Sequence, residues 1–423
     1  MGESANKRLA GAIGTSVASV TVPAVSSARR AVKEYALSSL LMASGLAITV
    51  AIRFQLLNYR SGDMNDCLLR WCDSIKETGL VQAMKSGSID YNVPYIYFLW
   101  LVTKLPFDRV WAIKSLSILC DYGCALAAGL IVWRIHRSAL RAAATAFALL
   151  VTPTVVFNSA LWGQSDMVYA APLVAAIAAA LGKRHALAAV FFGLAFAVKL
   201  QAVFILPLLG IWVLRREFPW RPLLLIPLVF FLCLVPAWIG GCSLVDLLGI
   251  YPRQTNHSTD LTNSAPSIFV FLPNNVEWFG VFGLWFAMAA IFLVALACIC
   301  TRVRTTPSLT LRQAATLACL TPFLLPYMHE RYIFLGDVLC VLYAFLRPKY
   351  FWVALLVIGA SFASYFKFLF SNLPVPLPIA ALMLGSACVF LVFDLLRSLY
   401  PAAFGVGDAG VPRGENQARW RMN

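Results

Sequence analysis

Long apolar runs alternate with short polar loops along most of the chain. The longest runs lie at residues 36–52, 117–133, 167–181, 222–240, 279–301 and 379–396. A helix needs about 20 apolar residues to cross the hydrocarbon core of a bilayer, and these runs approach or exceed that length. A membrane β-barrel would instead show alternating segments of about 10 residues. The pattern therefore predicts an all-α, polytopic membrane protein.

Composition supports this prediction and limits what the charge can mean. Of the 423 residues, 61% are hydrophobic and 13% are charged, whereas soluble globular chains carry about 25% charged residues. The net charge of +15 arises from Lys and Arg that are scattered through short loops. A nucleic-acid-binding protein would concentrate them on one basic face or domain. We therefore expect no nucleic acid partner and interpret the charge as a signal of membrane topology.

The basic loops recur after each pair of apolar runs, and the loops between them are nearly free of positive charge. Because cytoplasmic loops carry an excess of Lys and Arg, this alternation predicts about twelve spans with both termini in the cytoplasm. The expected organisation is a basic cytoplasmic tail at 1–35, a membrane domain at 36–400 and a second cytoplasmic tail at 401–423. Two long segments, 57–112 and 241–277, are then expected outside.

The first outer segment, 57–112, mixes acidic and basic residues and has helical periodicity. Apolar positions within 63–77 fall on one face of a helix, and a second helix is predicted from Tyr95 to Lys104, after Pro94. We expect these helices to be amphipathic and to lie on the membrane surface.

Four polar clusters lie at the ends of predicted spans. They contain Asp63 and Asp66; Trp162, Gln164 and Asp166; Lys199 and Gln201; and His329, Glu330 and Arg331. A charge at mid-bilayer costs on the order of 3 kcal/mol, so such clusters are candidates for function. All four fall on the outer face of a topology that was derived from other residues. This agreement predicts one shared site.

Each cluster also has a simpler explanation. Asp63 and Asp66 could be solvated loop carboxylates, and Trp162 could be an aromatic residue of the membrane interface. Asp166 could cap the following helix, and Lys199 could extend its ammonium from a helix end to the headgroup region. The run from His329 to Arg331 could likewise be the start of a helix whose charged side chains pair with one another.

The functional alternative is a site for an anionic headgroup. Lys199 and Arg331 suit a lipid phosphate, because Arg binds phosphate with a planar fork and Lys binds it as a point charge. Asp63 could then accept a proton from an incoming hydroxyl. Two of the four histidines, His257 and His329, also fall outside and are expected near the substrate. The outer cysteines Cys67, Cys72 and Cys242 permit a disulfide, but their spacing does not show one.

At these motifs the chain resembles the GT-C superfamily of multi-span glycosyltransferases, over nearly its full length. The segments Trp162–Asp166, Lys199–Pro207 and Met328–Tyr332 resemble signatures of bacterial mannosyltransferases related to the second mannosyltransferase of GPI-anchor synthesis. More distant similarity is to the dolichyl-phosphate-glucose glucosyltransferases, through Gly62-Asp63 and His329-Glu330-Arg331. Asp90 and Tyr91 match a further motif of these relatives in part.

The resemblance implies an inverting transfer of a hexose, mannose or glucose, from a polyprenyl-phosphate sugar to an acceptor hydroxyl. Asp63 would be the base, and Lys199, Gln201 and the run from His329 to Arg331 would bind the donor. We expect the substrate to be bound by Asp66, Asp90, Tyr91, Trp162, Gln164, Asp166 and His257. No cofactor is expected, and a divalent metal at Asp63 and Asp66 is not favoured. The acceptor would be a lipid-linked glycan, a polysaccharide or a protein.

The predicted site lies on the periplasmic or exterior face of a multi-pass plasma membrane, or on the luminal face of the endoplasmic reticulum in a eukaryote. The alternative is a secondary transporter or a flippase of lipid-linked sugars, because transporters also contain charges within the membrane and helices broken by proline. Clustering of the polar residues at one face, rather than at the midplane, opposes it.

Overall fold

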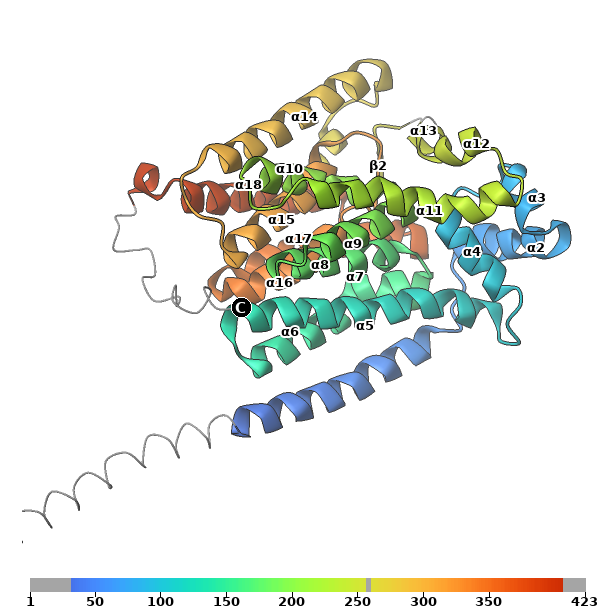
Figure 1. Ribbon diagram of the computed structural model, residues 1–423, viewed down its shortest axis with the longest axis horizontal. Coiled ribbons are helices and arrows are strands. Elements are labelled where there is room, and N and C mark those ends of the chain that lie inside the picture. Colours follow the sequence, from blue (N-terminus) through green and yellow to red (C-terminus); the bar gives the residue numbers. More distant parts are fainter. Residues whose placement is uncertain (1–31, 256–259, 406–423) are drawn as a thin grey trace, which may run out of the picture.

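The structure is a computed structural model that describes residues 32–255 and 260–405 (Figure 1). His257 and most of the two predicted tails lie outside the described residues. The described chain is predominantly helical, with most helices running along the long direction of the molecule.

Six described helices are long and apolar enough to cross a membrane. They are Val32–Leu56, α5 (Arg109–His136), Arg221–Ile239 with α11 (Leu225–Ile239), α14 (Val276–Cys300), Pro348–Phe370 with α17 (Phe351–Phe370), and α18 (Leu377–Leu399). A seventh span is possible if α6 (Ala139–Val151) and Pro153–Trp162, which meet at a 55° bend, count as one. The protein is therefore embedded in a membrane, but the predicted count of twelve spans is not confirmed.

Several of the remaining helices are too short to span a bilayer alone. Three of them are α8 (Asp166–Leu181), α9 (His185–Val198) and α16 (Phe334–Leu346). At a rise of 1.5 Å per residue they are roughly 20 to 24 Å long, against about 30 Å of hydrocarbon. Each begins or ends beside one of the predicted polar motifs, while its other end meets a basic loop. The polar motifs therefore lie deeper than the end of a helix that spans the full bilayer would.

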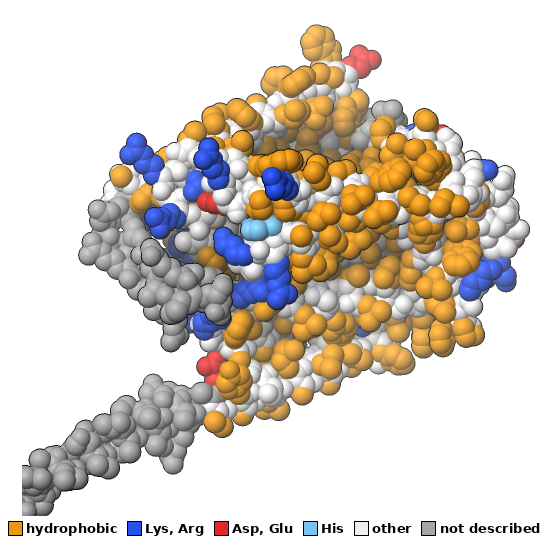
Figure 2. Space-filling model, in the orientation of Figure 1, with side chains coloured by type: hydrophobic (Ala, Val, Ile, Leu, Met, Phe, Trp, Pro, Cys, Tyr) orange, Lys and Arg blue, Asp and Glu red, His pale blue; other side chains and the backbone are white. Residues whose placement is uncertain are grey.

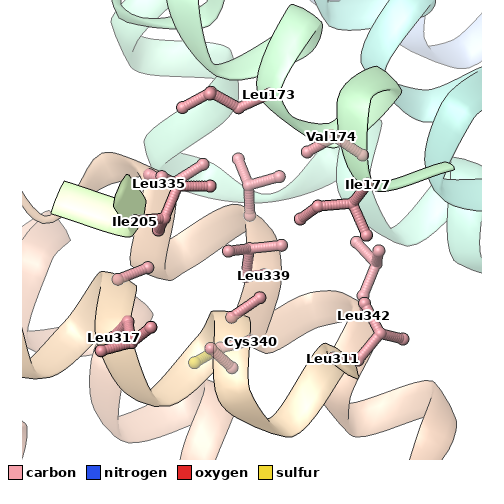
Figure 3. Packing of buried hydrophobic residues seen from close by; sticks show 14 of the residues in the cluster. Leu173, Val174, Ile177, Ile205, Leu311, Leu317, Leu335, Leu339, Cys340 and Leu342 are labelled. Carbon is pink, nitrogen blue, oxygen red and sulfur yellow. The ribbon is translucent and has the colours of Figure 1, made fainter. Parts of the chain in front are cut away.

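Small residues let the short helices pack closely. Both α8 and α9 are rich in alanine, and small side chains allow helix backbones to approach. Where α9 crosses α11, a Cβ on Gly193 would lie only 3.0 Å from the carbonyl oxygen of Ile226. Between these helices and α15 (Pro307–Leu324) and α16, branched side chains fill the core (Figure 3), with Leu173 and Ile177 near Leu335 and Leu339.

The first outer segment is helical, as predicted. It forms η1 (Met64–Leu68), α2 (Leu69–Thr78), α3 (Leu80–Lys85) and α4 (Val93–Val102). The expected apolar face of the first two is buried through Leu68, Cys72 and Ile75. The prediction that the second helix is amphipathic is wrong, because α4 also exposes Trp100 and Leu101 on its outer side. All eleven cysteines are free thiols.

The second outer segment contains one strand of a short β-sheet, which the all-α prediction did not include. After α12 (Leu244–Leu248) and α13 (Ile250–Thr255), strand β1 (Thr262–Asn263) pairs in parallel with β2 (Met328–His329), and η5 (Ile268–Phe271) follows β1. Asn263 is opposite His329 in this register. The pairing joins the long outer loop to the connection between α15 and α16, which contains the predicted His329 motif.

On the face that Figure 2 shows, most Lys and Arg side chains lie at the end opposite α2 and α3, a few lie at the α2 and α3 end, and apolar side chains cover much of the surface between. Several of these basic residues cap helix C-termini, whose last carbonyls lack partners. Arg215 donates to the carbonyl oxygens of Cys298, Thr301 and Val303 at 2.8, 3.1 and 2.6 Å, at the end of α14. The predicted basic loops and outer segments thus occupy opposite ends.

Candidate active site

Asp63 stands where three of the four predicted motifs meet. Its Oδ2 atom accepts hydrogen bonds from Trp162 Nε1 at 2.9 Å and from Gln164 Nε2 at 2.5 Å. Arg331 NH1 lies 3.7 Å from the same oxygen. The side chain is 34% exposed, and Oδ1 accepts no hydrogen bond from the described part of the chain. One carboxylate oxygen is thus fixed by the protein, while the other is unbonded within the described residues.

The tight contact between the Asp63 turn and the Trp162 motif depends on Gly163. This residue has φ of +82°, in the left-handed region that favours glycine. A Cβ at this position would lie 2.5 Å from Met64 Cε. Ser61 Oγ also donates to the carbonyl oxygen of Trp162 at 2.8 Å and accepts from the Met64 amide at 3.1 Å. These contacts fix the position of Asp63 relative to Gln164.

Lys114 stabilises the turn that leads to Asp63. Its ammonium is buried and donates to the carbonyl oxygens of Leu56, Leu57 and Tyr59 at 3.0, 3.0 and 2.7 Å. These carbonyls belong to the end of the first helix and the turn that leads to Asp63. Sequence reasoning missed Lys114, because a lone Lys near the start of an apolar run has no distinguishing pattern.

Asp166 is a buried partner of Lys199. It is the first residue of α8, and Ser165 occupies the N-cap position, so the capping interpretation of Asp166 is wrong. The carboxylate accepts from Lys199 Nζ at 2.5 Å and from Asn158 Nδ2 at 2.8 Å, and it is fully buried. Lys199 is 10% exposed. An ammonium that extends to the headgroups would be far more exposed, so that interpretation is wrong as well.

Arg331 joins the remaining motif to this centre. Its NH1 atom lies 3.0 Å from Glu330 Oε1, and its Nε atom lies 3.8 Å from Asp166 Oδ2. Burial disfavours the charged guanidinium, but Glu330 and the other nearby acidic groups more than offset this and raise the pKa of Arg331 well above its usual value. Its guanidinium also lies 5.5 Å from the ring centroid of Trp162, which is 1% exposed and is therefore no interface aromatic.

The two cations that were predicted to bind a lipid phosphate already have partners inside the protein. Lys199 is paired with the buried carboxylate of Asp166, and Arg331 with that of Glu330. With Asp63 included, three carboxylates surround the two cations, and Asp90 and Asp260 add two more carboxylates to the cavity wall. Arg331 Nε is buried and has no hydrogen bond within the described residues.

A cavity of about 340 Å³ opens beside this centre. Six predicted site residues line it: Asp90, Tyr91, Lys199, Gln201, His329 and Arg331. Asp63, Trp162 and Asp166 lie directly behind its wall, since Lys199 or Arg331 contacts each of them. Tyr91 bridges the two parts, because its hydroxyl donates to Gln164 Oε1 at 3.3 Å and accepts from Ser165 Oγ at 3.1 Å.

The remaining predicted residues are placed less centrally. Asp66 is 67% exposed and pairs with Arg70 at 3.3 Å on the outside of its helix. Glu330 is fully buried and does not line the cavity. Among the described residues, no group of three or more His, Cys, Asp or Glu side chains is placed to hold a metal ion.

Sequence reasoning missed about half of the cavity wall. The additional lining residues are Asn92, Val198, Tyr251, Gln254, Asp260, Asn263 and Tyr332. Most come from the long outer loop, where amide and hydroxyl side chains are common and carry no spacing pattern. Tyr332 was within the recognised motif but was not assigned a role.

A second missed feature is the buried pair of Arg53 and Asp121. Arg53 NH2 and Nε lie 2.8 and 3.0 Å from Asp121 Oδ2, which also accepts from Ser159 Oγ at 2.6 Å. Both charged side chains are at most 3% exposed. The pair joins the first helix to α5 and to the helix that carries Trp162. A charge inside a predicted span was the signal that could have found it.

Comparison with known protein families assigns this arrangement to a class. A sequence model of glycosyltransferase family 87 matches residues 91–326, which are 236 of the 423 residues. The chain belongs to glycosyltransferase family 87. No curated protein matches the chain. It is therefore a membrane-embedded glycosyltransferase of GT-C type, which requires a sugar donor and an acceptor. The comparisons give no support to the transporter or flippase alternative.

The matched region contains part of the candidate site of this glycosyltransferase. Tyr91, Gln164, Asp166 and Lys199 lie inside it, whereas Asp63 and the segment from His329 to Arg331 lie outside. The structure joins the two groups through the contacts of Asp63 with Gln164 and of Arg331 with Asp166. The candidate site thus combines residues from both the matched and the unmatched parts of the chain.

Proposed function

We propose that the protein transfers a hexose, mannose or glucose, from a polyprenyl-phosphate sugar to an acceptor hydroxyl, with inversion at the anomeric carbon. The observation that supports this most directly is the recessed cavity, which Lys199 and Arg331 line, with the one-third-exposed carboxylate of Asp63 directly behind Arg331. A lipid donor reaches such a site from the bilayer, whereas a nucleotide sugar would have to leave water.

The phosphate would bind at Lys199 and Arg331. Asp166 and Glu330 hold both cations in place, so their remaining N–H groups are oriented before the donor arrives. Preorganised donors stabilise charge that develops in the transition state, because they need no rearrangement as it forms. Here that charge is the second negative charge of the departing polyprenyl phosphate.

Asp63 would act on the acceptor side. The acceptor oxygen attacks the anomeric carbon and forms the new glycosidic bond, while the bond from that carbon to the phosphate oxygen breaks. Asp63 Oδ1 takes the hydroxyl proton, and the bonding electrons leave with the phosphate. Trp162 and Gln164 hold Oδ2, so the free oxygen keeps a fixed direction. This is the arrangement of a general base in an inverting displacement.

The proposed site would face the periplasm or an equivalent exterior compartment, because it lies at the ends of α8, α9 and α16 that are away from the basic loops. The acceptor would be a lipid-linked glycan, a polysaccharide or a protein. Polar side chains of the long outer loop, such as Gln254 and Asn263, reach the cavity and would contact sugar hydroxyls.

The test is a transfer assay with the full-length protein in nanodiscs. Polyprenyl-phosphate mannose and polyprenyl-phosphate glucose would be supplied separately, together with membrane-extracted acceptors, and the corresponding nucleotide sugars would serve as controls. We expect transfer from one of the lipid donors only, with the anomeric configuration reversed in the product. Transfer from a nucleotide sugar without lipid donor would refute the proposal.

A further inference from the structure

The cavity contains a contact between Asn263 on β1 and His329 on β2 that no sequence motif indicated. Asn263 Nδ2 lies 3.1 Å from His329 Nδ1, and both residues line the cavity. An amide nitrogen can only donate, so His329 Nδ1 must accept. In a neutral imidazole with one acceptor nitrogen, the other nitrogen carries the proton. The geometry therefore selects the tautomer that has hydrogen on Nε2.

No other described group competes for Nδ1 at hydrogen-bond distance. Glu330 Oε2 is 3.8 Å from Nδ1, which is too long for a hydrogen bond. The other titratable groups around His329 are Arg331 and Tyr332 on its own segment, Asp260 on the outer loop, and Asp90, Tyr91, Lys199 and Tyr251 across the cavity. The Asn263 amide is thus the group that sets the state of the neutral ring.

The backbone holds the two residues in register. Asn263 pairs with His329 in the parallel ladder, and its carbonyl oxygen accepts from the Glu330 amide at 3.1 Å. Ser264 and Tyr327, which flank the two strands, have φ of 57° and 65°. Non-glycine residues adopt this region at a cost, and such strain is found where the surrounding structure fixes a functional geometry. A two-residue sheet with strained ends is therefore well suited to holding one side-chain contact.

We propose that Asn263 is a positioning residue that makes His329 Nε2 a permanent hydrogen-bond donor to the phosphate of the sugar donor. This inference rests on the proposed function. The donor N–H exists in both the neutral and the protonated ring, so it persists through the imidazole titration. Without Asn263 the neutral ring could present a lone pair to the phosphate, which would repel it.

The decisive variant is Asn263→Asp. A carboxylate at this position accepts from Nδ1–H, so the neutral ring has its lone pair on Nε2 and the donor is lost whenever the ring is unprotonated. The ratio of the variant's donor KM to that of the wild type should rise with pH, by about tenfold between pH 6 and pH 9, which corresponds to one charge-assisted hydrogen bond. A ratio that is raised equally at every pH indicates a merely structural role and overturns the proposal.

Two further variants serve as controls. Asn275→Asp adds the same charge to the same loop, but Asn275 is exposed and caps α14 by accepting from the Trp278 amide, a role that Asp also fills. Its KM ratio should not change with pH. In a His329→Gln background, the amide offers a donor that does not titrate, so adding Asn263→Asp should produce no pH-dependent ratio. A rise of the same size in either control would refute the tautomer argument.

A direct measurement separates this inference from the proposed function. The chain has four histidines, so ¹⁵N-histidine NMR of the full-length protein in detergent is tractable, and His329→Gln identifies the signal. With the ring neutral, we expect protonated Nε2 in the wild type and protonated Nδ1 in Asn263→Asp. The same tautomer in both would overturn the inference even if the enzyme transfers sugar. If the tautomer switches but the wild type transfers no hexose from a lipid donor, the proposed function fails and the phosphate role fails with it.

Discussion

Two carboxylates, Asp63 and Asp166, are candidates for the base, and a pair of isosteric variants distinguishes them. Asp63→Asn keeps an amide oxygen that can still accept from Trp162 and Gln164, and the position is one-third exposed. We therefore expect a change in unfolding free energy of at most about 1 kcal/mol. The variant loses the proton acceptor, and a positioned base contributes about 10² to 10⁴ in rate.

Asp166→Asn should behave differently, because it leaves the buried ammonium of Lys199 without its carboxylate. Removing one partner of a buried ion pair costs roughly 3 to 5 kcal/mol, since the remaining charge stays desolvated. The double variant Asp166→Asn, Lys199→Gln removes both charges and should recover much of that stability. It should not recover activity, because the phosphate loses its ammonium partner.

Stability would be followed by denaturant titration of the detergent-solubilised variants, and activity by single-turnover transfer with the lipid donor. Donor affinity should be retained in Asp63→Asn, which separates loss of chemistry from loss of binding. The reasoning fails if Asp63→Asn keeps near-normal turnover while a fully stable Asp166→Asn loses it. The base would then be Asp166, and the structural role assigned to its ion pair would be wrong.

Three further predictions concern the walls of the site and its orientation. Arg331→Lys should raise the donor KM by about 10- to 100-fold, because a charge-assisted hydrogen bond from the guanidinium fork is lost, and an unchanged KM would remove Arg331 from the donor site. Gly163→Ala should destabilise the protein by about 1 to 2 kcal/mol, because the residue has a left-handed backbone conformation, and it should also lower turnover through the clash with Met64. Adding Met64→Ala should restore turnover but not stability. If the added substitution restored neither turnover nor stability, the packing argument would be contradicted. In cells, a cysteine at the exposed Ser88 should react with an impermeant maleimide and one at the exposed Arg302 should not; the opposite pattern would invert the topology.

The sequence alone was sufficient for the class of fold and for most of the charged members of the candidate site. Length of apolar runs is a one-dimensional property, so a membrane-embedded helical chain could be predicted from it and is confirmed. Charges beside hydrocarbon are costly wherever the chain folds, and this made Lys199, Asp166 and Arg331 recognisable before their partners were known.

Tertiary structure decided what those charges do. Whether Lys199 is free or paired depends on Asp166, which is 33 residues away in sequence and 2.5 Å away in space, and no periodicity encodes that contact. The same holds for Arg53 with Asp121 and for Asn263 with His329. Hydrogen bonds and ion pairs are short-range and directional, so they appear only when helices are placed to within a fraction of an ångström.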